Sequence, residues 1–517
     1  MTHLPTMHEH KGWRAYQWPV VWALGIVAFL LGWRGFWNYA VAHGESLTVV
    51  AAAYHSLQLF VLHCPHLSHP DWQLETARFL APAVFGYTAT QAFLVIFHQQ
   101  LQLLCLQFAS DHVIVCGLGR KGLQLVEDFR AQNKRVVVIE QDSSNDLGRV
   151  ARERGAMVLI GDATESGLLE RARLRSAAYL FAVTGNDGTN VQIAVCAHES
   201  MKKAERTSPG NLRCYVHIVN LDLRNAFKAS PTFLQAGEPI EVAIFNTYEN
   251  SARLLLRDHP LDHVRIGAND PRQVHLIVLG FGQMGQSVVV EAARMGHFAN
   301  GKKLRVTVVD REASQRKKRF YRWYPQFDKV CDATFVDGDV EELDVLAKVQ
   351  QWCAEKDAVP NLALCFDDET RCLAVALSIL PKLGEVDVPI LVRMPNEAGL
   401  ASLLTAAAGA DLARRVHVFG SVKKAAAEVT MDAKLDVYAR ASHETYRDLR
   451  LSKGEKPGSD PSLEPWDKLS EDLKESNRQQ ADHIPVKLRA IDCRAEPSLG
   501  ICLRNHGNLV RLAADQA

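Results

Sequence analysis

The sequence lacks an excess of charge of either sign. Its 517 residues include 59 Lys and Arg against 59 Asp and Glu, so the formal net charge is zero. A protein that holds nucleic acid by bulk electrostatics needs a basic surplus, and we therefore expect no nucleic-acid partner. A chain of this length is expected to contain about three or four domains.

Paired cysteines are missing as well. The eleven cysteines are scattered and never form CxxC, the spacing typical of zinc and dithiol redox sites. Cys116 and Cys365 lie in apolar runs that we interpret as core strands, where cysteine behaves as a small hydrophobic residue. We therefore expect free thiols, and a reducing cytoplasm as the compartment of the soluble domains.

Uncharged apolar runs occupy the N-terminal fifth of the chain, after a polar tail at 1–17. The stretch at about 18–39 begins with an apolar run that has tryptophan at both ends, and 79–97 carries no charge. Each comes close to the roughly 20 residues that a membrane-spanning helix needs. We predict two spans there, within a membrane region at 18–107.

The segment 46–62 between these spans is also uncharged. It is either a third span or a re-entrant helix, and a re-entrant helix would keep both chain ends on one side. Lys11 and Arg14 precede the first span, which favours the cytoplasm for that side. We therefore predict a multi-pass protein of the inner (cytoplasmic) membrane. A cleaved signal peptide is less favoured, because no small-residue cleavage site precedes Gly35.

The loop after Leu62 reads HCPHLSHPDW. It has no TVGYG-like run, so we expect no potassium-selective pore of the usual kind, although a non-selective pore stays open. His63, Cys64, His66 and His69 cluster here. No acidic partner is obvious and a polar loop explains them equally well, so we predict no metal site.

A strand, a glycine turn and a helix follow one another from residue 113. Val113–Cys116 is an unbroken apolar run, and the next residues read GLGRKG. Helix-forming residues and a second apolar run, Val136–Ile139, come next and end on Glu140. This order is typical of a Rossmann unit that binds a nucleotide.

The spacing predicts a separate role for each glycine of the turn. Gly117 permits the tight bend, Gly119 lets the backbone approach a pyrophosphate, and Gly122 lets helix and strand pack closely. The helix N-terminus, which begins with Arg120, favours negative charge. Glu140 is placed to accept hydrogen bonds from a ribose.

Polar residues also end the next two predicted strands, at 157–160 and 179–183. Ligands bind at the carboxyl ends of parallel strands, so Asp162, Thr184 and Asn186 are expected to line the adenosine end. The alternative is that Asp162 and Asn190 simply cap the helices that follow.

Taken in order, IVCGLGRKG, VIEQD, LIGDAT and AVTGNDGTN resemble the TrkA-N domain, the nucleotide-binding half of RCK modules that regulate potassium channels and transporters. The resemblance implies NAD(H), ATP or ADP in a first RCK domain at 108–268. The segment 241–260 resembles the crossover helix through which RCK modules pair, which implies a homodimer or tetramer.

The pattern repeats at 269–431, which we predict to be a second RCK domain. The acid that ends its second strand, Asp310, lies farther from the glycine turn because residues 300–303 lengthen the loop. The acidic run 367–369 would repel phosphates if it faced the cleft of this domain. The second copy is therefore expected either to bind a nucleotide or, as the resemblance to tandem RCK modules implies, to serve mainly as a dimer partner. Its expected residues are Gly280, Gly282, Gly285, Asp310 and Asp339.

The segment 432–495 resembles the RyR repeat domain first known from ryanodine receptors, and 496–517 forms a tail. The residues that carry this match are His443, Glu444, Trp466, Asn477 and Arg478. Trp466 would stack on a base and Arg478 would meet a phosphate. The alternative is that Trp466 packs the helix pair while Arg478 pairs with Glu475 or Asp482.

The fold class is therefore α/β: two tandem parallel-sheet domains, N-terminal membrane helices and a small helical C-terminal domain. We expect a membrane-anchored nucleotide sensor linked to potassium or other ion transport. The alternative is a pore-forming or membrane-disrupting effector that an ADP-ribose-like signal triggers through the RyR-like domain. No substrate domain or convergent acid and base follows the first Rossmann unit, so we do not expect an NAD-dependent oxidoreductase or another enzyme.

Overall fold

The computed structural model describes residues 11–44, 46–64, 70–107, 109–202, 211–230, 240–384, 386–395, 414–421, 424–425, 432–456, 458–491, 493–497 and 510–514. The chain divides into two compact units, Met1–Phe108 and Ala109–Ala517. The start of the predicted tail, His66 and His69 lie outside the described residues.

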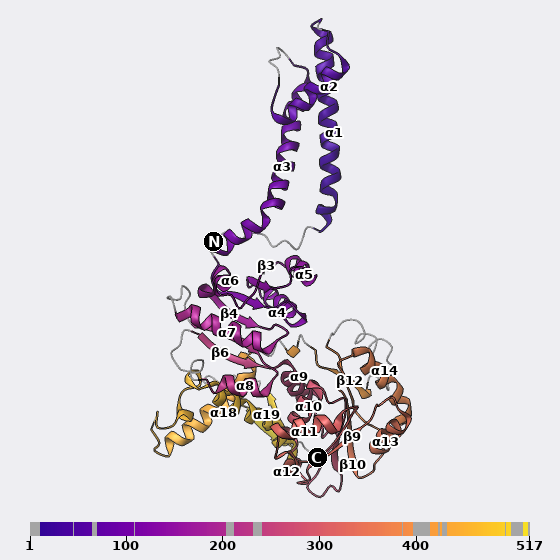
Figure 1. The fold of residues 1–517 in the computed structure, drawn as a ribbon, viewed down its shortest axis with the longest axis vertical. Helices are drawn as coiled ribbons and strands as arrows, with labels where there is room; N and C mark the ends of the chain where they lie inside the picture. The colour runs from indigo at the N-terminus through magenta and orange to yellow at the C-terminus, as the bar shows by residue number, and fades with distance from the viewer. Residues whose placement is uncertain are drawn as a thin grey trace. The chain divides into compact units, whose positions relative to one another are not determined.

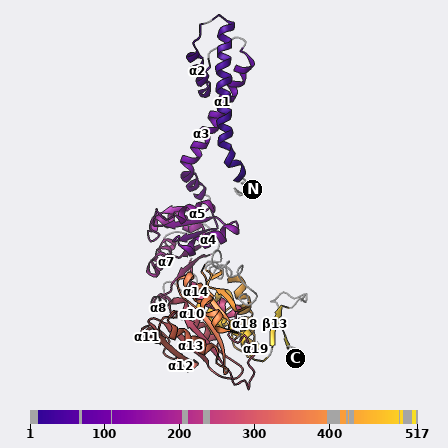
Figure 2. The same cartoon turned by 90° about the vertical axis from the view of Figure 1, so that its right-hand side faces the viewer.

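The described part of the first unit is helical. Its elements are α1 (Lys11–Ala42), α2 (Val49–Gln58), the 3-10 turn η1 (Leu59–Val61) and α3 (Trp72–Gln107). α1 and α3 lie side by side in both views (Figure 1, Figure 2), with small and apolar side chains buried in this bundle. The Ser56 hydroxyl of α2 donates to the Phe29 carbonyl of α1 over 2.7 Å, which ties the short helix to the long one.

Among the described residues, one helix is long and apolar enough to cross a membrane, Trp18–Ala42 within α1. The predicted second span, 79–97, lies inside the continuous helix α3, and the segment 46–62 contains α2 and η1. With a rise of 1.5 Å per residue, α2 is about 15 Å long, roughly half of a bilayer core. The apolar helical stretch Val49–Val61 is shorter than the roughly 20 residues that a span needs.

The second unit contains a six-stranded parallel sheet in the order β3-β2-β1-β4-β5-β6. This is the order of a doubly wound nucleotide-binding sheet. The strands are β1 (His112–Cys116), β2 (Val136–Glu140), β3 (Met157–Ile160), β4 (Ala177–Ala182), β5 (Leu212–His217) and β6 (Ile240–Phe245). The helical segments are α4 (Arg120–Ala131), α5 (Leu147–Glu153), α6 (Ser166–Arg171), η2 (Leu174–Ser176), α7 (Asp187–Lys202), α8 (Leu221–Lys228) and α9 (Thr247–Asp258).

The same unit contains a second six-stranded parallel sheet, in the equivalent order β9-β8-β7-β10-β11-β12. Its strands are β7 (Gln273–Leu279), β8 (Leu304–Asp310), β9 (Cys331–Asp337), β10 (Ala358–Leu364), β11 (Ile390–Arg393) and β12 (Val416–Phe419). Its helices are α10 (Gln283–Met295), α11 (Ala313–Trp323), α12 (Phe327–Val330), α13 (Leu343–Cys353), α14 (Glu369–Ile379) and η3 (Leu380–Leu383). The predicted fold class of two tandem Rossmann-like domains is confirmed.

Each central strand is buried on both faces. All five residues of β1 are buried, and neighbouring residues of β7 join different core clusters: Leu276 and Val278 contribute to one, Ile277 and Leu279 to the other. Because successive side chains of a strand point to opposite faces, helices must cover both sides of the sheet. This is why the strands appear in the sequence as continuous apolar runs.

The predicted crossover helix at 241–260 needs correction. Its first residues belong to β6, which pairs with β5, and the helix α9 begins only at Thr247. The run IEVAIF is rich in β-branched residues, which favours an edge strand. Asn246 then caps the helix, because its side chain accepts a hydrogen bond from the Tyr248 amide over 2.9 Å.

The C-terminal part consists mainly of two helices, with a 3-10 turn pair and a hairpin. The elements are α18 (Asp432–Ser452), η4 (Pro461–Leu463), η5 (Trp466–Lys468), α19 (Glu471–Ala490), β13 (Cys493–Pro497) and β14 (Val510–Ala514). Two ion pairs hold α19 to the segment at and after α9: Asp482 lies 2.6 Å from Arg253, and Arg489 lies 3.0 Å from Asp262.

Candidate functional site

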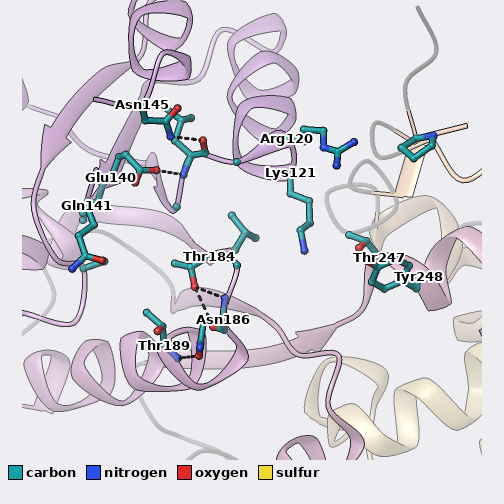
Figure 3. A pocket seen from close by; sticks show the side chains of 18 of the residues that line it. Arg120, Lys121, Glu140, Gln141, Asn145, Thr184, Asn186, Thr189, Thr247 and Tyr248 are labelled. Atoms are coloured by element: carbon teal, nitrogen blue, oxygen red, sulfur yellow. Dashed lines mark hydrogen bonds between the residues drawn. The ribbon is translucent and has the colours of Figure 1, made fainter. Parts of the chain in front are cut away.

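A cavity of about 700 Å³ lies at the carboxyl ends of β1, β2 and β4. Seven of the eight residues predicted for the first site line it: Gly117, Gly119, Arg120, Glu140, Asp162, Thr184 and Asn186. Figure 3 shows Glu140 and Gln141 at one side of this cavity and Arg120, Lys121, Thr247 and Tyr248 at the other. The structure thus brings the predicted first-site residues together.

The glycine turn is shaped by close approaches of the backbone. Gly117 has φ +96°, and a Cβ there would lie 2.8 Å from the Thr184 Cα. Gly122 does not line the cavity, but a Cβ there would lie 2.0 Å from the Gly117 carbonyl oxygen, so it allows the helix to touch the turn. A Cβ at Gly119 would meet no atom of the described residues within 4 Å, so the turn leaves open space beside it.

Glu140 is held by the turn that it faces. Its Oε2 accepts a hydrogen bond from the Leu118 amide over 2.7 Å, and its Oε1 accepts one from the Asp142 amide over 3.0 Å. Asn145 donates to the Leu118 carbonyl over 3.0 Å. A carboxylate fixed in this way retains acceptor capacity for a ribose hydroxyl.

The predicted adenosine residues line the cavity and also hold local turns, but neither Asp162 nor Asn190 caps a helix: the N-cap residue of α6 is Glu165, and Asn190 lies inside α7. Asp162 accepts hydrogen bonds from the amide and hydroxyl of Thr164 over 2.8 and 2.7 Å, and these lower its pKa. The Asn186 side chain accepts from the Thr189 amide over 3.0 Å near the start of α7. These hydrogen bonds and ligand contact are compatible, because each carbonyl or carboxylate oxygen accepts more than one bond.

Asn190 fixes the end of β4 against the end of β5. It is fully buried; its Oδ1 accepts from the Thr184 amide over 2.8 Å, and its Nδ2 donates to the His217 carbonyl over 2.9 Å. This arrangement holds Thr184 at the cavity wall.

Lys121 is a partly buried cation in the cavity wall. Its Nζ lies 3.2 Å from Nε2 of His217, and that ring nitrogen lies 3.2 Å from the Thr247 hydroxyl. Burial lowers the pKa of Lys121 to about 8, against the opposing charge of Asp187. Burial, followed by the Lys121 charge, lowers the pKa of His217 to about 3, so the imidazole is neutral near pH 7.

The far wall of the cavity comes from the second Rossmann domain. Arg393 of β11 lines it with a side chain that is 8% exposed, and its guanidinium lies 5.6 Å from the ring centre of Tyr248. Arg120 lies across the domain boundary from Glu369 at 3.9 Å. Both domains therefore contribute to one cleft.

The second glycine turn repeats the geometry of the first. Gly280 has φ +93°, a Cβ at Gly285 would lie 2.1 Å from the Gly280 carbonyl oxygen, and the Phe281 amide donates to Asp310 over 2.7 Å. A cavity of about 440 Å³ lies beside this turn, and Gly282 and Asp339 also line it.

Arginines cross this second cavity and engage its acids. Arg371 lies 2.5 Å from Asp339, which also pairs with Arg311, and Arg316 lies 3.3 Å from Asp310. Burial alone would raise the pKa of Asp339, but a backbone hydrogen bond and these arginines lower it. The two acids predicted to hold a second nucleotide are thus already occupied by side chains of the same domain.

The RyR-like residues have packing roles. The indole of Trp466 is 6% exposed and packs with Ala439 and Leu469. It therefore has no free face on which a base could stack, and the packing interpretation replaces the stacking one.

Hydrogen bonds and an ion pair engage three of the other four RyR-like polar groups. His443 is buried with Nε2 2.9 Å from the Glu464 carbonyl, and Asn477 donates to the Leu473 carbonyl over 2.8 Å. Arg478 lies 3.7 Å from Glu475, one of the two expected partners, whereas Glu444 is exposed.

The sequence interpretation missed Lys121, Thr247, Tyr248 and Arg393. Lys121 follows Arg120 in the glycine turn, so its charge was a local signal that could have been used. The other three lie far along the chain: Thr247 and Tyr248 come from α9 of the first domain, and Arg393 comes to the cavity from the second domain through the packing of the two.

The fold and this cleft define a Rossmann domain with the geometry of a nucleotide-binding site. Residues 113–220 match the family model of the TrkA-N domain. The predicted resemblance is therefore confirmed for this part of the chain.

Two relatives share this part of the chain. Potassium channel protein 1 of Methanocaldococcus jannaschii is 31% identical over 88 residues, 17% of this chain and 26% of that protein. The Trk system potassium uptake protein TrkA homolog of Pyrococcus abyssi is 25% identical over 114 residues, 21% of this chain and 50% of that protein. The matched part thus spans half or less of each relative.

Solved structures resemble a larger part of the chain at lower identity. The GsuK structure bound to ADP is 14% identical with a TM-score of 0.42, covering 82% of this chain and 98% of that chain. The GsuK channel bound to NAD is 12% identical with a TM-score of 0.43, covering 84% and 85%.

Proposed function

We propose that this protein is a membrane-anchored nucleotide sensor that binds an adenine nucleotide or NAD(H) in the first Rossmann cleft. The observation that carries the proposal is the cavity at the first glycine turn. It has an acid at one side, open space at Gly119 and cations at the other side, as a nucleotide with its ribose and phosphates requires.

The regulated element is the N-terminal helical unit, which we propose to be a multi-pass segment of the inner membrane with the sensor in the cytoplasm. A potassium channel protein and a potassium uptake protein are among the relatives. We therefore propose a link to potassium or other ion transport. Binding shifts the membrane segment only if the two states of the sensor differ in their affinity for the ligand.

We further propose that the sensor works as a homodimer or tetramer, which the RCK resemblance implies. In this proposal the α18–α19 helix pair is a fixed regulatory contact on the first Rossmann domain, because ion pairs to Arg253 and Asp262 hold α19. It is not the entry point of the ligand, since Trp466 is buried.

Thermal unfolding of the full-length protein in detergent tests the proposal against NAD, NADH, ATP, ADP, AMP and ADP-ribose. A ligand at one hundred times its dissociation constant adds about 2.7 kcal/mol of stability. We expect at least one of these nucleotides to raise Tm in the wild type and none to do so in Gly119→Asp. The matched control is Gly167→Asp, which lies on α6 outside the cavity and also has no atom of the described residues near its Cβ. If no ligand raises Tm, or if Gly119→Asp responds like wild type, the proposal is wrong.

A further inference from the structure

The cations of the first cavity gather at the end away from Glu140. Arg120 and Lys121 lie on the side of Tyr248 in Figure 3, and Arg393 lies over the Tyr248 ring. A nucleotide with its ribose at Glu140 and its first phosphate at the glycine turn would direct the rest of its phosphate chain toward these cations.

Two acids of the second domain already contact these cations. Asp367 Oδ1 lies 2.5 Å from Arg393 Nη1, and Glu369 Oε1 lies 3.9 Å from Arg120 Nη1. The acid between them, Asp368, instead caps α14 by accepting a hydrogen bond from the Thr370 amide over 2.8 Å. Of the acidic run, Asp367 lines both the first and the second cavity, Asp368 lines the second, and Glu369 lies beside the first only through its ion pair with Arg120.

The Asp367–Arg393 contact joins an exposed acid to a buried cation. The side chain of Asp367 is 82% exposed and that of Arg393 is 8% exposed, and the Phe366 carbonyl also accepts a hydrogen bond from Arg393 over 3.0 Å. The Nε of Arg393 has no hydrogen-bond partner among the described residues. Arg393 is thus held in place by the backbone, while its carboxylate partner is free to move into water.

We propose that Asp367 and Glu369 occupy the places of terminal phosphates, and that a nucleoside 5′-diphosphate or triphosphate displaces them from Arg393 and Arg120. Arginine binds carboxylate and phosphate with the same donors, so one anion replaces the other without leaving a buried charge unpaired. The same cations disfavour the nicotinamide end of NAD, because the nicotinamide ring of NAD is positively charged.

The exchange would also affect how the two domains meet. Arg120 belongs to the first domain and Glu369 to the second, so displacement of Glu369 breaks an ion pair between them. This inference rests on the proposed function and deepens it: it names the ligand class and the contact through which binding changes the domain interface.

Isothermal titration of the full-length protein in detergent with ATP, ADP, AMP and NAD tests this exchange. Asp367→Ala and Glu369→Gln should each tighten ADP and ATP binding by roughly threefold to tenfold, because a competing anion is removed. Arg393→Ala should weaken both by about tenfold, and the Asp367→Ala/Arg393→Ala double variant should be as weak. AMP, whose single phosphate lies at the glycine turn, should be unaffected.

The matched control is Asp387→Ala, whose acid lies 3.7 Å from Arg414 in the same domain but outside the cavity. It should bind like wild type. Unchanged or weaker ADP binding in Asp367→Ala would overturn the exchange, and equal tightening of NAD would overturn the ligand class. Absence of any binding by wild type would overturn the proposed function as well, whereas equal affinities in wild type and variants would overturn this inference alone.

Discussion

The two Rossmann domains share a strand order, a glycine turn and an acid that accepts a hydrogen bond from that turn. They differ in what lies in front of the turn. A Cβ at Gly119 would meet no atom of the described chain within 4 Å, whereas a Cβ at Gly282 would lie 3.8 Å from Arg316 and 3.9 Å from Asp367.

The charged side chains of the two cavities differ as well. In the first cavity the cations are Lys121, Arg393, which contacts the exposed Asp367, and Arg120, which lies across the domain boundary from Glu369. In the second, Asp339 and Asp310 are engaged by three arginines of their own domain. A glycine fingerprint thus sets the backbone of a nucleotide site, while side chains from later in the chain decide whether the cavity beside it is open.

The largest expected effect concerns the close packing that both glycine turns have at their third glycine. Gly122→Ala and Gly285→Ala should each destabilise the protein by about 3 kcal/mol, because the new methyl group meets a backbone carbonyl that cannot move aside. The loss should be similar in both domains, since a Cβ at these positions would lie 2.0 and 2.1 Å from the carbonyl oxygen. Chemical denaturation without ligand measures it. A tolerated substitution in either domain would contradict the close packing of that turn.

The next effect separates the two sites. Gly119→Asp should weaken nucleotide binding by about a hundredfold, or about 2.7 kcal/mol, because a carboxylate then lies where a phosphate binds. Gly282→Asp should leave nucleotide affinity unchanged. Titration calorimetry on both variants measures the difference, and equal losses would show that the two sites are not distinct in the way proposed.

A smaller effect concerns Lys121. Lys121→Met keeps the length of the side chain and removes the charge, so nucleotide affinity should fall by about tenfold while the ligand-free protein is no less stable. Lys134→Met is the matched control, because Lys134 pairs with Asp111 outside the cavity and should leave binding unchanged. A loss of stability without loss of affinity would assign Lys121 a purely structural role.

The smallest effect is a pH dependence confined to the first site. The pKa of Lys121 is about 8 in the ligand-free protein, and a bound phosphate would raise it, so binding takes up a proton as pH passes 8. Affinity should therefore fall a few-fold between pH 7 and 9 in wild type and stay flat in Lys121→Met. A flat profile in wild type would show that Lys121 does not contact the ligand phosphates.

Local pattern was enough to predict the fold class and the central strands of both sheets, but not the edge strand β6 or the strands β11 and β12. Buried parallel strands are continuous apolar runs, and the glycine turn joins strand to helix within a few residues, so β1, α4 and β2 were predicted from adjacent residues. The segment 241–260 was mistaken for one helix because its first residues form the edge strand β6, which is fixed by pairing with β5, more than twenty residues earlier.

Every residue that was predicted for this site, and that lines it, belongs to the first domain. Glu140 and Thr184 follow strands whose neighbours the topology fixes, so their place at the cleft could be inferred. Arg393 reaches the same cleft through the packing of the two domains, and Tyr248 through the packing of α9, and no local pattern encodes either. Trp466 carries a recognisable motif, but its burial depends on the way the two C-terminal helices meet.

The most direct test of the account is the number of nucleotides that one chain binds, measured by titration calorimetry of the full-length protein with ADP. The account predicts one ADP per chain, bound in the first cleft and lost in Gly119→Asp. Two ADP per chain, or one that survives Gly119→Asp and disappears in Gly282→Asp, would contradict it.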